Sequence, residues 1–209
     1  AAAQPLLDRH AALYAQSPFR RESLYLQAAN LARLGRWNDA APLLDKIAAE
    51  PGANSFLASV LLERARCHAA AGESAGALEK VDRLEKECPD SEILGAALLF
   101  KGDLALKEGG DGGRACYETA LALAEKHGDR GVAGEALYRL ILMLGASPEK
   151  PRLKEALPFI DRFWKDHGDD SPWRDRVAIA QAAALDAAGR EKEALERLRA
   201  VIAGPDPAG

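Results

Sequence analysis

Alanine recurs at near-regular intervals along this chain, each time close to the start of a helical pattern of apolar residues. The six positions lie 37, 37, 38, 41 and 38 residues apart and are Ala3, Ala40, Ala77, Ala115, Ala156 and Ala194. The segment AQPLLDRHAA at residues 3–12 returns as AAPLLDKIAA at residues 40–49. Self-similarity at a period of about 20 to 50 residues is typical of a solenoid, in which one supersecondary unit is copied along the chain.

Each copy has the pattern of two antiparallel helices joined by a tight turn. Leu24, Ala28 and Leu31 form an apolar stripe at helical spacing, Gly35 ends that helix, and a second stripe follows in residues 37–49. The chain is therefore expected to form one continuous domain. Its units are a half repeat at residues 3–16 and hairpins at residues 18–51, 54–89, 91–128, 129–168 and 171–204.

Small residues are expected where two helices approach each other closely, because interaxial distances of about 8 to 10 Å admit little more than Ala or Gly. On the first helices these positions are Ala28, Ala65, Gly102 and Ala182. On the second helices they are the alanines of the series. In the hairpin of residues 91–128 this register predicts a buried stripe of Ala115, Thr119 and Ala122.

The composition favours an all-α chain and argues against nucleic acid as a partner. Hydrophobic residues make up 48% of the chain but aromatic residues only 6%, so Ala and Leu, both strong helix formers, supply most of the apolar surface. The net charge is −4, with 28 Lys and Arg interspersed among 32 Asp and Glu, so no basic stripe would attract a phosphate backbone. No apolar run approaches the roughly 18 residues of a transmembrane helix.

The spacing of these residues resembles the tetratricopeptide repeat. One copy matches the family pattern at Leu24, Ala28, Leu31, Gly35, Trp37, Ala40, Leu44, Ile47 and Pro51. The resemblance implies a right-handed superhelix of about five antiparallel helical hairpins that binds a protein or peptide on its concave face. The chain departs from the family in its period, which is 37 to 41 residues instead of 34, and in its first helices, where Leu, His or Ala replaces most aromatics.

Two segments resemble different branches of this family. Residues 89–102 are similar to repeats of periplasmic proteins of Gram-negative bacteria, which favours the cell envelope over the cytoplasm. Residues 122–144 are similar to the longer repeats of bacterial signal-sensing regulators. A binding scaffold and a sensor module of a larger signalling protein therefore both stay open.

No catalytic, metal-binding or cofactor-binding pattern is found, so an enzyme domain is the alternative that the sequence supports least. Cys67, Cys88 and Cys116 lie 21 and 28 residues apart and fit neither a metal site nor a disulfide framework. The motif His-Gly-Asp occurs at residues 127–129 and 167–169, where Gly is expected to end one helix and Asp to cap the next.

The resemblance places the first helices on the concave face and so implies a set of binding residues. Tyr25 and Tyr138 occupy equivalent positions in their copies, and flat amphipathic rings suit a peptide groove. The full set is Tyr25, Arg33, Leu62, Arg66, Asp103, Lys107, Glu135, Tyr138, Arg139 and Arg176.

The two ends of the chain carry apolar side chains that would be covered inside a longer array. They are Leu6, Leu7 and Leu13 in the half repeat, and Val201 and Ile202 near the other end. We therefore expect the chain to be a piece of a longer array. We also expect weak self-association through the exposed terminal helices.

Overall fold

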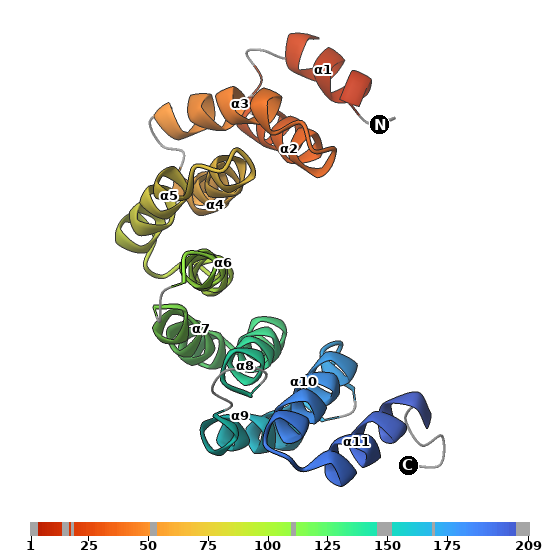
Figure 1. Cartoon of the computed structure of the whole chain (residues 1–209). Coiled ribbons are helices and arrows are strands. Elements are labelled where there is room, and N and C mark those ends of the chain that lie inside the picture. The colour runs from red at the N-terminus through yellow and green to blue at the C-terminus, as the bar shows by residue number, and fades with distance from the viewer. Residues whose placement is uncertain are drawn as a thin grey trace. The chain divides into compact units, whose positions relative to one another are not determined.

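A computed structural model describes residues 4–13, 17, 19–50, 54–109, 112–145, 152–168 and 170–203. Within these residues the chain forms eleven α-helices and no strand, so the predicted all-α class is confirmed. Figure 1 shows the order of the helices along the chain. The helices are α1 (Gln4–Leu13), α2 (Arg20–Arg33), α3 (Trp37–Ala49), α4 (Asn54–Ala70), α5 (Ser74–Glu87), α6 (Leu94–Lys107), α7 (Gly113–His127), α8 (Arg130–Gly145), α9 (Leu153–Asp166), α10 (Arg174–Ala187) and α11 (Glu191–Ala203). None of these described helices is both long and apolar enough to cross a membrane. Ala3 and Pro51 lie outside the described residues.

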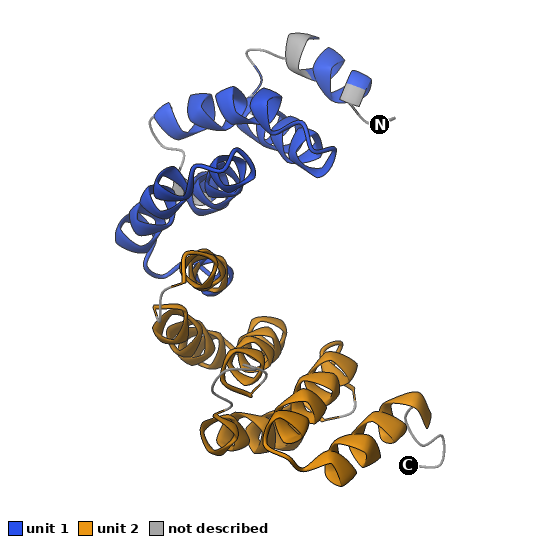
Figure 2. Ribbon diagram, in the orientation of Figure 1, with its two compact units in different colours: residues 1–97 blue, residues 98–209 orange. Residues whose placement is uncertain are grey.

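The chain divides into two compact units, residues 1–97 and 98–209, with the boundary inside α6 (Figure 2). In the first unit, α2 packs against α3, α3 against α4, and α4 against α5. In the second unit, α7 packs against α8, α8 against α9 and α10, and α10 against α11. Hairpins of consecutive helices are thus the building block of both units.

The turns inside the hairpins are built alike. Gly35 adopts a left-handed backbone with φ of 74°, and the amide of Arg36 donates to the carbonyl of Leu31 at 2.9 Å. Gly72 and Gly189 have the same handedness in the corresponding turns. A residue with a Cβ is strained there, which is why glycine follows α2, α4 and α10 at these turns.

The first His-Gly-Asp motif caps helices as the sequence predicts. Gly128 has φ of 73° directly after α7, and the Oδ1 atom of Asp129 accepts a hydrogen bond from the amide of Val132 at 3.0 Å in the first turn of α8. Gly168 likewise has φ of 59°, whereas Asp169 lies outside the described residues.

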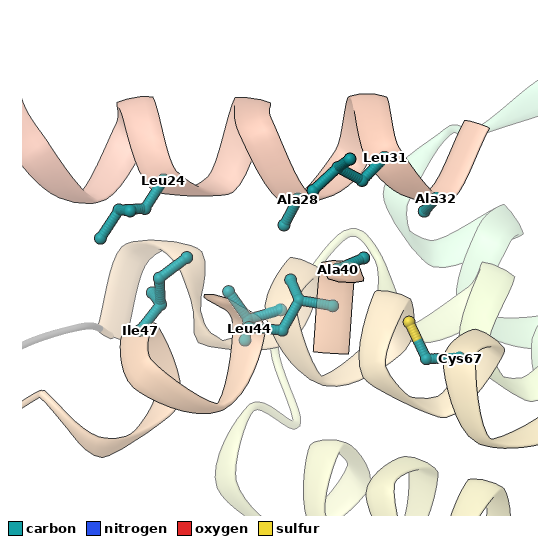
Figure 3. Packing of buried hydrophobic residues seen from close by; sticks show 9 residues of the cluster. Leu24, Ala28, Leu31, Ala32, Ala40, Leu44, Ile47 and Cys67 are labelled. Carbon is teal, nitrogen blue, oxygen red and sulfur yellow. The ribbon is translucent and has the colours of Figure 1, made fainter. Parts of the chain in front are cut away.

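In the first unit, α2 and α3 meet through small residues at the points of closest approach. Ala28 and Ala40 are both fully buried, and Leu44 and Ile47 fill the space beside them, as Figure 3 shows. Ala77 of α5 is also fully buried. The burial predicted for these alanines is confirmed.

In the second unit, the register predicted for α7 is wrong. Ala115, Thr119 and Ala122 are exposed, and the buried face of α7 instead runs through Gly113, Tyr117, Ala120, Leu121 and Ala124. The helix is rotated so that the ring of Tyr117, which is 1% exposed, lies against Gly102 of α6. A Cβ on Gly102 would lie 2.4 Å from Tyr117 Cε1, so only glycine leaves room for the ring.

Replacing a buried alanine of the series should overpack the hairpin. We expect Ala40→Leu and Ala77→Leu each to lower the free energy of unfolding by about 1 to 3 kcal/mol, because both side chains have no exposed surface to expand into. Urea unfolding followed by circular dichroism measures the loss. Ala75→Leu, at an exposed position of α5, is the matched control and should stay within about 0.5 kcal/mol of the parent protein. Equal stability of all three variants would contradict the packing described above.

Gly102→Ala should destabilise the protein although alanine favours helix by about 1 kcal/mol. The added methyl group would collide with Tyr117, and overpacking of this kind costs about 1 to 3 kcal/mol. Gly131→Ala, at an exposed position of α8 where the added Cβ would lie 3.3 Å from Asp129 Oδ1, is the control and should stay within about 0.5 kcal/mol of the parent protein. A stabilising effect of both substitutions in urea unfolding would rule out tight contact between Tyr117 and α6.

Candidate binding surface

The predicted binding residues of the first unit stay apart from one another. Tyr25 is half-buried, with its ring centroid 6.1 Å from that of Phe56, and Leu62 is only 5% exposed, so its side chain packs inside the unit instead of offering surface. Arg33 and Arg66 are exposed, and Arg66 pairs with Glu63 at 2.5 Å. In the described part of this unit no hydrogen bond, ion pair or ring contact joins any two of the four predicted residues.

Three of the predicted residues of the second unit, Asp103, Glu135 and Arg139, form a polar network centred on Arg139. Its Nε and Nη2 atoms donate to the two carboxylate oxygens of Asp103 on α6, at 2.9 and 3.0 Å. Its guanidinium also pairs with Glu135, one turn earlier on α8. Tyr117 donates its hydroxyl to Oδ1 of Asp103 at 2.7 Å. Three helices therefore converge on one carboxylate and one guanidinium.

The network keeps Arg139 positively charged and Tyr117 neutral. Burial alone would lower the pKa of Arg139, but the hydrogen bonds with Asp103 and Glu135 raise it, so the guanidinium stays charged. Burial, and then the hydrogen bond to Asp103, raise the pKa of Tyr117, so its phenol stays neutral and continues to donate. The bidentate geometry of Arg139 and Asp103 also orients both side chains, which preorganises this part of the surface.

A second group, formed by α8 and α10, stacks two aromatic rings and a guanidinium. The rings of Tyr138 and Trp173 lie 5.5 Å apart at an angle of 22°, and Cζ of Arg176 lies 4.9 Å from the centroid of the Trp173 ring. Gly134 makes room for the indole, because a Cβ there would lie 3.1 Å from Trp173 Cδ1. We call Tyr138, Trp173 and Arg176 the stack.

The stack is partly open. Arg176 is exposed, and Tyr138 and Trp173 are half-buried. Among the described residues, Arg176 makes no hydrogen bond or ion pair, so its donors are available to a ligand. Two apolar side chains on the same helices, Leu142 on α8 and Ile179 on α10, are 42% and 52% exposed.

Trp173 and Tyr117 are the residues that the sequence analysis misses. Trp173 precedes α10, and its amide donates to the Ser171 hydroxyl at 3.2 Å, so Ser171 opens a turn before a helix that begins at Arg174. Tyr117 is missed because the register predicted for α7 does not put it on the buried face of that helix. A glycine inside a helix, such as Gly102, is the signal that could have revealed a large side chain opposite.

Lys107, the remaining predicted residue, is exposed on α6.

Cys67 and its neighbour His68 take part in packing and pairing within the first unit. Cys67 is buried, and burial raises the pKa of its thiol, which disfavours the reactive thiolate. His68, its neighbour, contacts a carboxylate oxygen of Glu73 through Nδ1 at 2.7 Å. Among the described residues no three His, Cys, Asp or Glu side chains gather in a group that could hold a metal ion.

The structure is similar to solved tetratricopeptide structures, whereas no protein-family model and no curated protein matches the sequence. A tetratricopeptide repeat protein from Parabacteroides merdae aligns over 98% of this chain and 73% of its own, with 17% identity and a TM-score of 0.65. TPR-like repeats of a putative kinesin light chain from Podosopora anserina align over 89% and 94%, with 20% identity and a TM-score of 0.69. BtubC (BKLC) from P. vanneervenii aligns over 99% and 91%, with 14% identity and a TM-score of 0.76. The tetratricopeptide-type fold expected from the sequence is therefore confirmed.

Tyr117→Phe should lower the free energy of unfolding by about 1 kcal/mol, because it removes the buried hydroxyl that donates to Asp103. Tyr138→Phe is the matched control: its hydroxyl makes no hydrogen bond in the described structure, and its loss should change stability by less than about 0.5 kcal/mol. Both values come from urea unfolding. Equal effects of the two substitutions would mean that the hydroxyl of Tyr117 contributes nothing through Asp103.

Proposed function

We propose that this chain is a non-catalytic scaffold that binds a protein or peptide segment. The surface that we assign to this role comprises the stack and the Arg139 network, both of which include residues of α8. The aromatic rings would cover apolar or planar groups of the segment, and Arg176 would receive a carboxylate or a carbonyl oxygen. The fold shared with tetratricopeptide repeat proteins supports a binding role, because stacked hairpins create extended surfaces on which partners bind.

The observation that carries this proposal is the open stack. Tyr, Trp and Arg are the side chains most enriched among residues that dominate binding energy at protein interfaces. Here all three gather at one place, held by Gly134 below the indole and by the packing of α8 against α10. Side chains that are already ordered lose less conformational entropy on binding, which favours affinity.

We place this activity in the bacterial cell envelope. The support is the resemblance of residues 89–102 to repeats of periplasmic proteins. The mixed surface charge, with a net value of −4, suits a protein partner better than a nucleic acid. Fractionation of a bacterial host that expresses the full reading frame tests the compartment separately from the binding.

Binding is tested by selecting peptides from a random display library on the immobilised protein. The double variant Tyr138→Ala, Arg176→Ala should bind the selected peptides at least about 10-fold more weakly, since loss of such anchors costs more than about 1.4 kcal/mol. Fluorescence anisotropy with labelled peptides measures the affinities. Lys154→Ala, at an exposed position of α9, should bind like the parent protein.

A thermal melt of the double variant separates loss of binding from loss of fold. No enrichment of peptides over a blank surface would overturn the scaffold proposal. Undiminished binding by a folded double variant would keep a scaffold but remove the stack from its binding surface.

A further inference from the structure

The last two helices of the second unit form an open apolar groove. It has a volume of about 420 Å³ and lies between one face of α10 and one face of α11. Ala182 and Ala194 are buried and make its floor, whereas Ile179 and Leu195, at 52% and 53% exposed, make its walls. A floor of alanines between larger walls is the shape that receives leucine side chains of a packing helix.

The rim of this groove is acidic. Asp186 is the last residue of α10 that lines the groove, and Glu191 is the first on α11; both are exposed. Neither makes a side-chain hydrogen bond or ion pair in the described part of the chain. The groove therefore favours an amphipathic helix that carries a basic residue between apolar ones.

Helix α1 has such a face and turns it to solvent. Leu6, Arg9 and Leu13 follow one another at intervals of three and four residues, so they lie along one side of the helix. The two leucines are 70% and 65% exposed, and Arg9 is exposed and makes no ion pair among the described residues. The side of α1 next to these leucines is held on α2, where His10 contacts the hydroxyl of Ser23 at 2.9 Å.

The two surfaces also match in length. Leu6 and Leu13 are separated by seven residues, or about 10 Å of helix, and the same separation joins Ile179 to Asp186 along the groove. The spacing of the two leucines thus matches the length of the α10 side of the groove, and Arg9 supplies a positive charge on the same side of α1.

We propose that α1 of one molecule docks into the groove between α10 and α11 of a second copy of this chain. This contact uses neither the stack nor the Arg139 network, so it goes beyond the proposed function. Its two surfaces differ from each other, so the contact is heterologous and leaves one free α1 and one free groove at the ends of every assembly. A contact of one short helix buries far less than the roughly 1,200 Å² of a stable interface, so the association is weak and grows with concentration.

Sedimentation velocity of the whole chain over a wide concentration range tests the proposal. The parent protein should show a series of oligomers that shortens at high salt, because Arg9 and the acidic rim attract each other through solvent. The helix variant is Leu6→Glu with Leu13→Glu. The groove variant is Ala183→Arg, which changes an exposed α10 residue that lines the groove. Each variant should be monomeric alone. Both change exposed positions, so both should retain the circular dichroism and melting temperature of the parent.

Mixing the two variants gives the decisive measurement. The helix variant still has an intact groove and the groove variant still has an intact α1, so the mixture should form a heterodimer that grows no further. Leu142→Glu, which changes an exposed leucine outside both surfaces, should associate like the parent protein. A strictly monomeric parent protein would overturn the proposal and leave the groove to a different protein. So would a mixture that stays monomeric, or a helix variant that still forms the parent's oligomers.

Discussion

The close approach of helix backbones at Ala and Gly is the constraint on which the rest of this structure depends. Ala28, Ala40 and Ala77 have no exposed surface, and Gly145 and Ala184 approach so closely that a Cβ on the glycine would lie 2.5 Å from the alanine Cβ. Where helices are this close, side chains on the flanks are brought within reach of the next helix. The ion pair between Arg139 and Asp103 and the stacking of Tyr138 on Trp173 both span two helices in this way.

The sequence predicts the helical hairpins of this fold well because both of its signals are local. Apolar residues three and four apart define a helix face, and a glycine after that face marks the left-handed turn, as Gly35, Gly72 and Gly189 show. The rotation of α7 could not be predicted in this way. Ala and Gly lie on several of its faces, so spacing alone does not select one, and the contact that decides it is between Tyr117 and a glycine on another helix.

The residues of the candidate site also fall into those that helical spacing predicts and those that it does not. Helical spacing places Glu135, Tyr138 and Arg139 on one face of α8, and the structure has them there. Trp173 escapes prediction because it lies in a turn, where no periodicity applies, and reaches the site only through the packing of α10 on α8. Leu62 shows the opposite case, since its position on a helix face does not reveal that a neighbouring helix covers it.

The pairing of Gly102 with Tyr117 makes one hairpin unlike its neighbours. In the hairpin of α2 and α3, by contrast, Ala28 and Ala40 are buried beside Leu44 and Ile47. Transplanting α5 into the place of α7 would leave a void as large as a phenol ring above Gly102, and the reverse exchange would drive a tyrosine into Ala65 or its neighbours. Gly102 and Tyr117 are therefore a matched pair, so α6 and α7 can be exchanged for helices of another hairpin only together.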